Sequence, residues 1–257
     1  MLDKTLKVFS NDIEFIILCC SIDVREIVII SERSAIKQEV KDYFDRENVN
    51  HILTTSDEIE GLRLQADIGL MFGFGIKLSA LILSNHSHGV LNFHPGSLTH
   101  YRGRHPIGWA LIERQPSIIL SIHKVELQFD LGDIFLEIKV PISNQDTEKN
   151  VLKRLRKNLT LEMVTLLISR LLENKPIKRI ESGRYLPSLK NKFDVLISEE
   201  HCSSFLIGLS RAKYDYGGFR LNGKQVGLVH RAEAVHLTTK VVSFLCNNGE
   251  TVYGKCE

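Results

Sequence analysis

Two polar side chains stand two positions apart at the end of an apolar segment, in the stretch GVLNFHPGS. Side chains at alternate positions of a strand point to the same face, so an extended segment here puts Asn92 and His94 side by side. An amide and a protonated imidazole can donate hydrogen bonds to the oxyanion that develops during acyl transfer. The pair is therefore either the solvated end of a strand or half of a catalytic site.

A second stretch, FDLGDIF, places Asp130 and Asp133 on either side of Gly132. We expect it to form a loop between two strands that returns to the sheet edge where Asn92 and His94 lie, since ligand sites of open α/β sheets occur at that edge. A carboxylate beside a histidine orients the imidazole and favours its charged form. With Asp130 helping to move a proton, the three groups would suit the transfer of an acyl group to an amine.

Short apolar runs alternate with amphipathic segments, which predicts the sheet that must position these residues. The pattern is typical of an α/β fold, a Rossmann-like, mostly parallel twisted sheet with helices on both faces. Asp12 and Ser34 are the expected N-caps of two helices, and Pro106 opens another. Strands are expected at residues 6–10, 25–32, 66–75, 89–94, 117–125 and 134–142, and helices at residues 12–20, 34–49, 78–83, 106–114 and 147–174.

The composition shifts after Lys175-Pro176, which predicts two domains. Residues 1–182 are expected to form the catalytic domain, and residues 183–257 a small α+β domain with a helix over 199–212. Asn-Gly pairs at 222–223 and 248–249 predict β-hairpins there. Apolar residues alternate along these hairpins. This pattern suits a homodimer interface, which we expect, and it suits packing against the main domain equally well.

The bulk composition narrows the function classes. A net charge of +2 and a pI near 8.2 give no charge excess for a nucleic-acid partner. The five cysteines lack C-x-x-C spacing, which indicates reduced thiols of a cytoplasmic protein. No signal peptide or membrane-spanning stretch is expected, and hence no membrane partner. His86 and His88 are spaced like a metal pair, but without a Cys or carboxylate cluster we expect surface histidines and no metal.

The stretch LNFHPGSLTHYRG, followed by LQFDLGDI, resembles the formyltransferase family that uses 10-formyltetrahydrofolate. The resemblance implies that Asn92, His94 and Asp130 are catalytic and that 10-formyltetrahydrofolate is the formyl donor. The stretch GLMFGFGIKLS resembles the strand and loop that form one wall of the family's folate pocket. The implied folate contacts are Met71, Phe72, Gly73, Gly75, Ile76, Val125, Asp130 and Asp133. Gly96-Ser97 and Thr99 depart from the family pattern, which alters the turn after the strand and leaves the three catalytic groups intact.

The resemblance leaves the formyl acceptor open. Glycinamide ribonucleotide transformylases cradle a phosphate in a Gly-rich loop after the first strand, whereas FSNDIEFI has no glycine. Methionyl-tRNA formyltransferases are longer and need basic surface for a nucleic acid. The tail SGRYLP…LSRAKYDYGGF resembles that of sugar N-formyltransferases, which implies a dTDP-linked 3- or 4-amino dideoxyhexose for bacterial surface polysaccharide (O-antigen). A methionyl-tRNA formyltransferase-like enzyme, a 10-formyltetrahydrofolate deformylase and a non-catalytic sugar-nucleotide-binding protein remain alternatives.

Several further residues are candidates for binding the sugar nucleotide, since arginine binds phosphate bidentately. The structural alternatives are that Lys77 is a solvated lysine, that Arg102 only fixes the loop and that Trp109 belongs to the core. Ser121 and His123 share one face of a predicted strand, and Ser121 is expected to point to the pocket; the chain has no G-x-S-x-G motif for serine hydrolase chemistry. The sugar-nucleotide candidates are Lys77, Tyr101, Arg102, Arg104 and Trp109.

Overall fold

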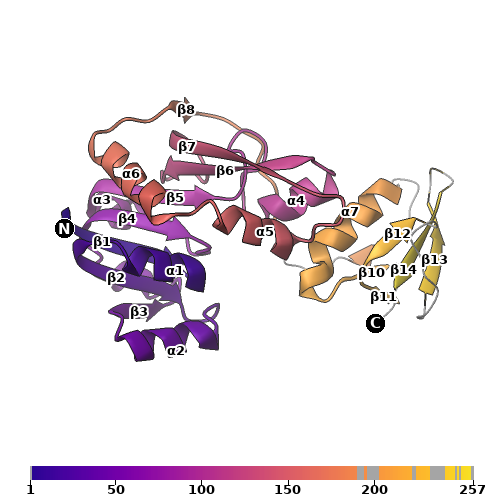
Figure 1. The fold of residues 1–257 in the computed structure, drawn as a ribbon, viewed down its shortest axis with the longest axis horizontal. Helices are drawn as coiled ribbons and strands as arrows, with labels where there is room; N and C mark the ends of the chain where they lie inside the picture. The colour runs from indigo at the N-terminus through magenta and orange to yellow at the C-terminus, as the bar shows by residue number, and fades with distance from the viewer. Residues whose placement is uncertain are drawn as a thin grey trace. The chain divides into compact units, whose positions relative to one another are not determined.

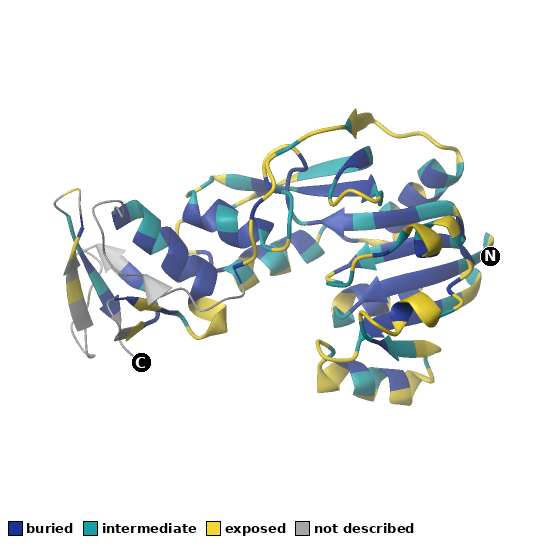
Figure 2. Ribbon diagram, turned by 180° about the vertical axis from the view of Figure 1, so that it is seen from behind, coloured by how far each residue is buried: buried dark blue, intermediate teal, exposed yellow. Residues whose placement is uncertain are grey.

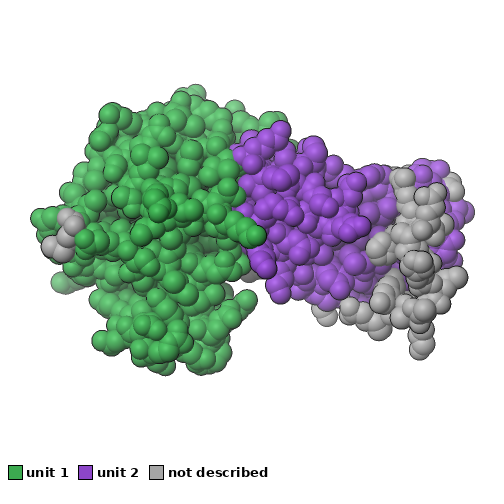
Figure 3. All heavy atoms as spheres, viewed as in Figure 1, with its two compact units in different colours: residues 1–100, 120–138, 156–184 green, residues 101–119, 139–155, 185–257 purple. Residues whose placement is uncertain are grey.

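The computed structural model describes residues 2–189, 194–195, 203–221, 224–231, 241–246, 248 and 250–255. These residues form two compact units: residues 1–100, 120–138 and 156–184 make the first, and residues 101–119, 139–155 and 185–257 the second (Figure 3). The predicted boundary at 182/183 stays a prediction. No helix in the described part of the chain is long and apolar enough to cross a membrane.

An eight-stranded sheet in the order β3-β2-β1-β4-β5-β6-β7-β8 carries the candidate residues (Figure 1). The strands from β3 to β5 are all parallel, and β6 pairs antiparallel with β5, as β8 does with β7. This mostly parallel sheet confirms the predicted Rossmann-like class. The strands are β1 Leu2–Ser10, β2 Val24–Glu32, β3 His51–Thr54, β4 Ala66–Phe72, β5 His86–His94, β6 Ser117–Lys124, β7 Gly132–Pro141 and β8 Lys178–Ile180.

Helices cover both faces of the sheet. The step from β1 to β2 runs one way along the sheet and the step from β4 to β5 the other way, so right-handed crossovers put α1 and α3 on opposite faces. Figure 1 shows α1 and α6 on the near face. The helices, with two 3₁₀ turns, are α1 Ile13–Cys20, α2 Gln38–Glu47, η1 Ile59–Gly61, α3 Ala80–Ser84, α4 Pro106–Ile112, α5 Glu148–Arg156, α6 Leu161–Leu172, α7 Ser203–Lys213 and η2 Tyr214–Tyr216.

The core of the first unit has two layers, one on each side of the sheet. Under α1, the Phe15 ring lies 5.3 Å from Phe72 and 5.0 Å from Phe93, centroid to centroid. Under α3 lies a cluster of buried apolar residues that we call the α3-side cluster: Phe9, Ile30, Ile59, Leu64, Leu78, Ile82 and Val90. Figure 2 shows the central strands between these layers as buried. Both faces of the central strands are thus covered by apolar side chains, as is usual for parallel strands.

The second unit contains two smaller sheets, β11-β10-β9 and β12-β14-β13. Helices α4 and α7 pack so closely that a Cβ atom at Gly208 would come within 2.6 Å of the Leu111 carbonyl oxygen. The glycine makes this approach possible. Antiparallel pairs β10/β11 and β13/β14 flank the predicted hairpin turns, while residues 222–223 and Gly249 lie outside the described residues. The strands are β9 Asp194–Val195, β10 Phe219–Leu221, β11 Lys224–Val226, β12 Val229–Arg231, β13 Val241–Leu245 and β14 Thr251–Lys255.

The expected caps are partly right. Asp12 accepts a hydrogen bond from the Phe15 backbone N–H, and Pro106 opens α4, as predicted. Ser34 is the wrong cap: the Ala35 and Ile36 N–H groups both bond to the Glu32 carbonyl in a tight turn, so α2 begins only after Lys37. The predicted helix-forming segment 199–212 appears as α7, with residues 199–202 outside the described residues.

Two other expectations are wrong. The helix expected over 147–174 is two helices, because the Thr160 side chain accepts from the Met163 N–H and caps a new helix while the apolar spacing runs on unchanged. His86 is buried and not on the surface: its ring lies 5.7 Å from the Phe9 ring, and its Nδ1 lies 2.8 Å from the Ile82 carbonyl oxygen. Strands β3 and β8 are not predicted by the sequence pattern.

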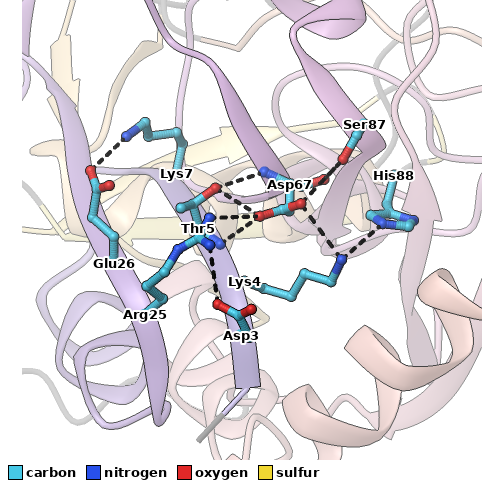
Figure 4. Close-up of polar contacts among 9 residues, drawn as sticks. All are labelled: Asp3, Lys4, Thr5, Lys7, Arg25, Glu26, Asp67, Ser87 and His88. Carbon is cyan, nitrogen blue, oxygen red and sulfur yellow. Dashed lines mark hydrogen bonds and ion pairs between the residues drawn. The ribbon is translucent and has the colours of Figure 1, made fainter.

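The edge of the sheet where β1, β2, β4 and β5 begin is joined by a polar network around Asp67 (Figure 4). The Thr5 backbone N–H donates to Asp67 Oδ2 over 2.8 Å, and the Thr5 hydroxyl donates over 3.0 Å. The bond from the Thr5 N–H holds the pKa of the Asp67 carboxyl below its usual range, and the Thr5 hydroxyl, Lys4 and Arg25 act in the same direction against the effect of burial. Asp67 therefore ties β4 to β1.

We expect Asp67→Asn to lower the free energy of unfolding at pH 7 by about 1 kcal/mol, since the amide keeps an acceptor oxygen and loses the charge. A carboxyl with a lowered folded pKa stabilises above its unfolded pKa, and this stability is lost as the pH falls through the folded pKa. The difference between wild type and variant should therefore shrink as the pH falls from about 5 to about 2. Urea unfolding at several pH values measures it, with the exposed Asp57→Asn as control; a constant difference would contradict the assignment.

Candidate active site

The pairing of β5 with β6 brings four polar side chains together. In this antiparallel pair Asn92 lies opposite His123, and His94 lies opposite Ser121. Side chains directly opposite each other in an antiparallel pair share one face of the sheet. We call these four residues the polar patch. It lies on the same face as Val90 and thus next to the α3-side cluster.

Asp130 joins the polar patch from the loop between β6 and β7. Its Oδ1 lies 3.6 Å from His94 Nδ1 and 3.8 Å from His123 Nε2. The side chains of His94 and Asp130 are only 5% and 11% exposed, so water screens their interaction little. The structure therefore brings Asn92, His94 and Asp130 together at the sheet edge where the sequence predicts a site.

The local backbone explains how Asp130 reaches this position. Asp130 has a φ of 50° and Gly132 a φ of 115°, both in the left-handed region. A Cβ atom at Gly132 would come within 3.0 Å of the Lys124 carbonyl oxygen, so the loop closes tightly only with glycine there. Aspartate is one of the few residues that accept a left-handed conformation, although it is a less favourable one. The strain lies at the residue that contacts His94.

His123 is neutral in this arrangement. Burial lowers its pKa to about 4; the neighbouring His94 acts in the same direction, and Asp130 and the backbone carbonyls of Lys124 and Leu131 act against it. His123 Nδ1 lies 3.1 Å from the Lys124 carbonyl oxygen, and its Nε2 lies 3.2 Å from Asn92 Nδ2. A carbonyl oxygen only accepts, so Nδ1 carries the proton and Nε2 accepts from the Asn92 amide.

Ser121 completes the polar patch with an unusual feature. Its side chain is completely buried, and its hydroxyl oxygen has no hydrogen-bond partner. An unpaired buried hydroxyl costs about 1–3 kcal/mol, so it needs an explanation in a native fold. Ser121 lies directly opposite His94 in the β5/β6 pair, so the unsatisfied hydroxyl belongs to the part of the patch that holds His94.

The predicted folate wall lies partly beside the polar patch. Met71 pairs with Asn92 across the β4/β5 ladder, and Met71, Ile76 and Val125 pack against the α3-side cluster while partly exposed. Phe72 is not brought to this wall, because its ring packs on the opposite face against Phe15. Gly73 takes a φ of 62° just after β4, and the Gly75 N–H donates to Glu32 Oε1 over 2.6 Å.

The loop that carries Asp130 also displays apolar side chains. Phe129 is 46% exposed and Leu127 is 54% exposed. Lys77, on the loop after β4, holds its Nζ 5.0 Å from the centre of the Phe129 ring. Asp133, at the start of β7, makes a 3.1 Å ion pair with Arg179. The two loops therefore meet through Lys77 and Phe129, next to Asp130.

The remaining sugar-nucleotide candidates belong to the second unit. The Tyr101 hydroxyl donates to Glu113 Oε2 over 2.6 Å, and the Arg102 guanidinium lies 5.9 Å from the centre of the Tyr185 ring. Trp109 Nε1 donates to the Pro187 carbonyl oxygen over 2.8 Å, and Arg104 is exposed. Their roles in binding stay predictions, as do those of the other candidate site residues.

Sequence reasoning places Ser121 and His123 on one strand face but does not assign His123 to the site. The usable signal is the repetition of a polar pair at the same spacing, N-x-H on one strand and S-x-H on the next. The register that sets the two pairs opposite each other is not readable from spacing alone. Within the described ranges, no group of three or more His, Cys, Asp or Glu side chains is placed to hold a metal ion.

The chain matches the family model described as formyl transferase over residues 25–167. It is 31% identical to the methionyl-tRNA formyltransferase of Listeria monocytogenes serotype 4a (strain HCC23) over 106 residues, which is 41% of this chain and 34% of that protein. The match thus spans about a third of the length of that curated relative.

Two solved structures share the fold over the whole chain. WlaRD, a sugar 3N-formyltransferase solved with dTDP and 5-N-formyl-THF, has a TM-score of 0.70 at 13% identity, covering 100% of this chain and 98% of that one. The N-formyltransferase of Helicobacter canadensis, solved with folinic acid and dTDP-3-aminofucose, has a TM-score of 0.69 at 13% identity and covers 100% of both chains. Because the family model spans more than half of the sequence and includes all three residues at the sheet edge, the chain belongs to the formyl transferase family.

Proposed function

We propose that the protein transfers a formyl group from 10-formyltetrahydrofolate to the amino group of a nucleotide-linked amino sugar, a dTDP-linked 3- or 4-amino dideoxyhexose. The observation that carries the proposal is the convergence of Asn92, His94 and Asp130 on one buried sheet edge. The sugar nucleotide is inferred from the two sugar N-formyltransferases that share the fold along the full chain.

The three residues have distinct tasks in this reaction. When bound, 10-formyltetrahydrofolate supplies the formyl carbon and the nitrogen that leaves. Asn92 and His94 donate hydrogen bonds to the negative charge that develops on the formyl oxygen as the sugar amine adds to the carbon. Asp130, at ion-pair distance from His94 Nδ1, assists the transfer of the proton from the amine to the leaving nitrogen. The products are a formamido sugar and tetrahydrofolate.

The residues beside the polar patch offer apolar surface on which the face of a flat heteroaromatic ring can stack. Met71, Ile76 and Val125 offer partly exposed apolar surface that is fixed by the α3-side cluster. Phe129 adds an exposed aromatic face next to Asp130. Pockets of this kind, apolar with a few fixed polar groups, are typical of cofactor sites. We therefore assign the pterin part of the donor to this wall.

The carboxylate of Glu32 lies at the sheet edge where β1, β2 and β4 end. Its presence argues against an acceptor whose terminal phosphate binds at that edge. Glu32 Oε1 accepts from the Gly75 N–H over 2.6 Å and from Asn11 Nδ2 over 2.7 Å. Backbone N–H groups at such an edge bind phosphate in nucleotide-binding sheets. Here a negative side chain already uses one of these N–H groups, which disfavours a ribonucleotide phosphate.

The same catalytic groups could act on a methionyl-tRNA amine or, with water in place of an amine, as a deformylase. A folate-coupled assay with a panel of dTDP- and UDP-amino sugars, charged initiator tRNA and no acceptor separates these functions. We expect tetrahydrofolate and formamido sugar in equal amounts with one dTDP-amino sugar. Formate release at the same rate without an acceptor would identify a hydrolase, and formylation of the tRNA alone would overturn the sugar assignment.

The wider setting belongs to the same proposal. We place the reaction in the cytoplasm, in the synthesis of a bacterial surface polysaccharide such as O-antigen or lipopolysaccharide. We also infer a homodimer. Leu245 on β13, an edge strand of its sheet, is 67% exposed and gives apolar surface for such a contact.

Removing a donor or the proton carrier should slow the chemical step. We expect His94→Asn and Asp130→Asn each to lower kcat by about 100- to 1,000-fold, as losses of oxyanion donors do. Steady-state kinetics with the preferred acceptor measure the effect. His88→Asn and Asp57→Asn are matched controls outside the site, and variants at His94 or Asp130 with turnover near wild type would refute the mechanism.

Removing the aromatic face should weaken the donor instead. We expect Phe129→Ala to raise the KM for 10-formyltetrahydrofolate by about 10-fold, since stacking on an aromatic ring contributes about 1–3 kcal/mol. The kcat at saturating donor should change little because Phe129 carries no reacting group. Leu81→Ala, which removes an exposed apolar side chain on α3, is the control. An unchanged KM for the donor would remove Phe129 from the donor wall.

A further inference from the structure

His123 holds the amide of Asn92 in one orientation. Oxygen and nitrogen of a carboxamide have similar shapes, so only the bonding partner decides which of them faces a given side. Because His123 Nδ1 donates to the Lys124 carbonyl, the Nε2 atom that faces Asn92 is a pure acceptor. The Asn92 amide must then present its nitrogen to His123. The second N–H on that same nitrogen is left as a donor beside His94.

The neutral ring of His123 also affects Asp130. Asp130 Oδ1 lies almost as close to His123 Nε2, at 3.8 Å, as to His94 Nδ1, at 3.6 Å. A proton on His123 Nε2 would make it a competing partner for this carboxylate. It would also turn the Asn92 amide around, because an N–H at Nε2 attracts the amide oxygen. A single proton on this ring would thus disturb two catalytic groups.

We propose that His123 is a positioning residue, a proton-free acceptor that keeps the Asn92 nitrogen directed to the reacting oxygen and leaves Asp130 to His94. The proposal rests on the proposed function, in which Asn92 is a hydrogen-bond donor. Its physical basis is the position of His123, completely buried on the strand opposite Asn92, with each ring nitrogen engaged. His94, Asp130 and the backbone carbonyls of Lys124 and Leu131 are the polar groups that face the ring.

Two substitutions separate this role from mere filling of space. The glutamine of His123→Gln can place a carbonyl oxygen near the position of Nε2 and accept from Asn92, whereas the leucine of His123→Leu cannot accept at all. We expect His123→Leu to lower kcat by about 10- to 100-fold with both KM values within about threefold of wild type, the size of effect seen when a supporting hydrogen bond is lost. His123→Gln should recover most of the loss.

His86 offers a matched control for burial. It is also a buried histidine of this sheet, with Nδ1 on a backbone carbonyl, but its Nε2 has no partner. We expect His86→Leu to keep the kcat of wild type, and thermal melts establish that each variant is folded. A kcat for folded His123→Leu equal to that of wild type would overturn the proposal, as would equal losses in His123→Leu and His123→Gln.

Nitrogen NMR of the imidazole rings tests the same point without turnover. We expect the His123 resonances to report a proton on Nδ1 and none on Nε2 from about pH 6 to pH 8, since the ring is neutral there. A charged ring or a proton on Nε2 in this range would refute the positioning role even in an active enzyme. The expected tautomer in a protein that formylates no acceptor would instead leave the acceptor contact standing and reject the proposed function.

Discussion

The antiparallel pairing of β5 with β6 is the constraint on which the candidate site depends. The strands from β3 to β5 are parallel. A further parallel strand next to β5 would place its own C-terminal end beside His94. The reversal at β6 instead sets His123 opposite Asn92 and Ser121 opposite His94. A slip of this register by one residue would turn the side chains of β6 to the other face. The polar patch therefore exists only in this one alignment of two strands.

The loop after β6 adds a carboxylate to the site and does so at a cost. Asp130, in the connection between β6 and β7, and Gly132, the first residue of β7, are both in left-handed conformations. Strain of this kind persists where the surrounding structure fixes it, and the buried ends of β6 and β7 do so here. Since β6 also carries His123, the same strand positions the carboxylate and the acceptor of the Asn92 amide. Both are thus fixed relative to His94 by one backbone.

The sequence predicts much of this arrangement and misses a definite part of it. Runs of β-branched residues identify β2, and the two-residue spacing alone is enough to put Asn92 and His94 on one face of a strand. The length of the helix after β7 is misjudged because the apolar spacing continues through the break that Thr160 caps. Local patterns carry periodicity and caps, so they predict elements better than the junctions between them.

What no local pattern carries is the partner of a strand. The expected return of its loop to the sheet edge and the family resemblance both place Asp130 near His94. The acceptor role of His123, in contrast, needs the β5/β6 register and the Lys124 carbonyl that fixes its tautomer. At Phe72 the sequence neighbours are misleading. They suggest that Phe72 belongs to the folate wall, whereas strand alternation turns its ring toward Phe15.

The contacts among the polar side chains explain how a largely apolar face of the sheet can contain polar and charged groups. Polar side chains inside a core are costly unless they bond to one another. Asn92 and His123 satisfy each other, and His94 lies within ion-pair distance of Asp130. Within the patch, Ser121 has a hydroxyl without a partner, although an alanine would fill the same place at lower cost. The cost falls on the residue paired with His94, and violations of the packing rules by native proteins are expected at functional sites.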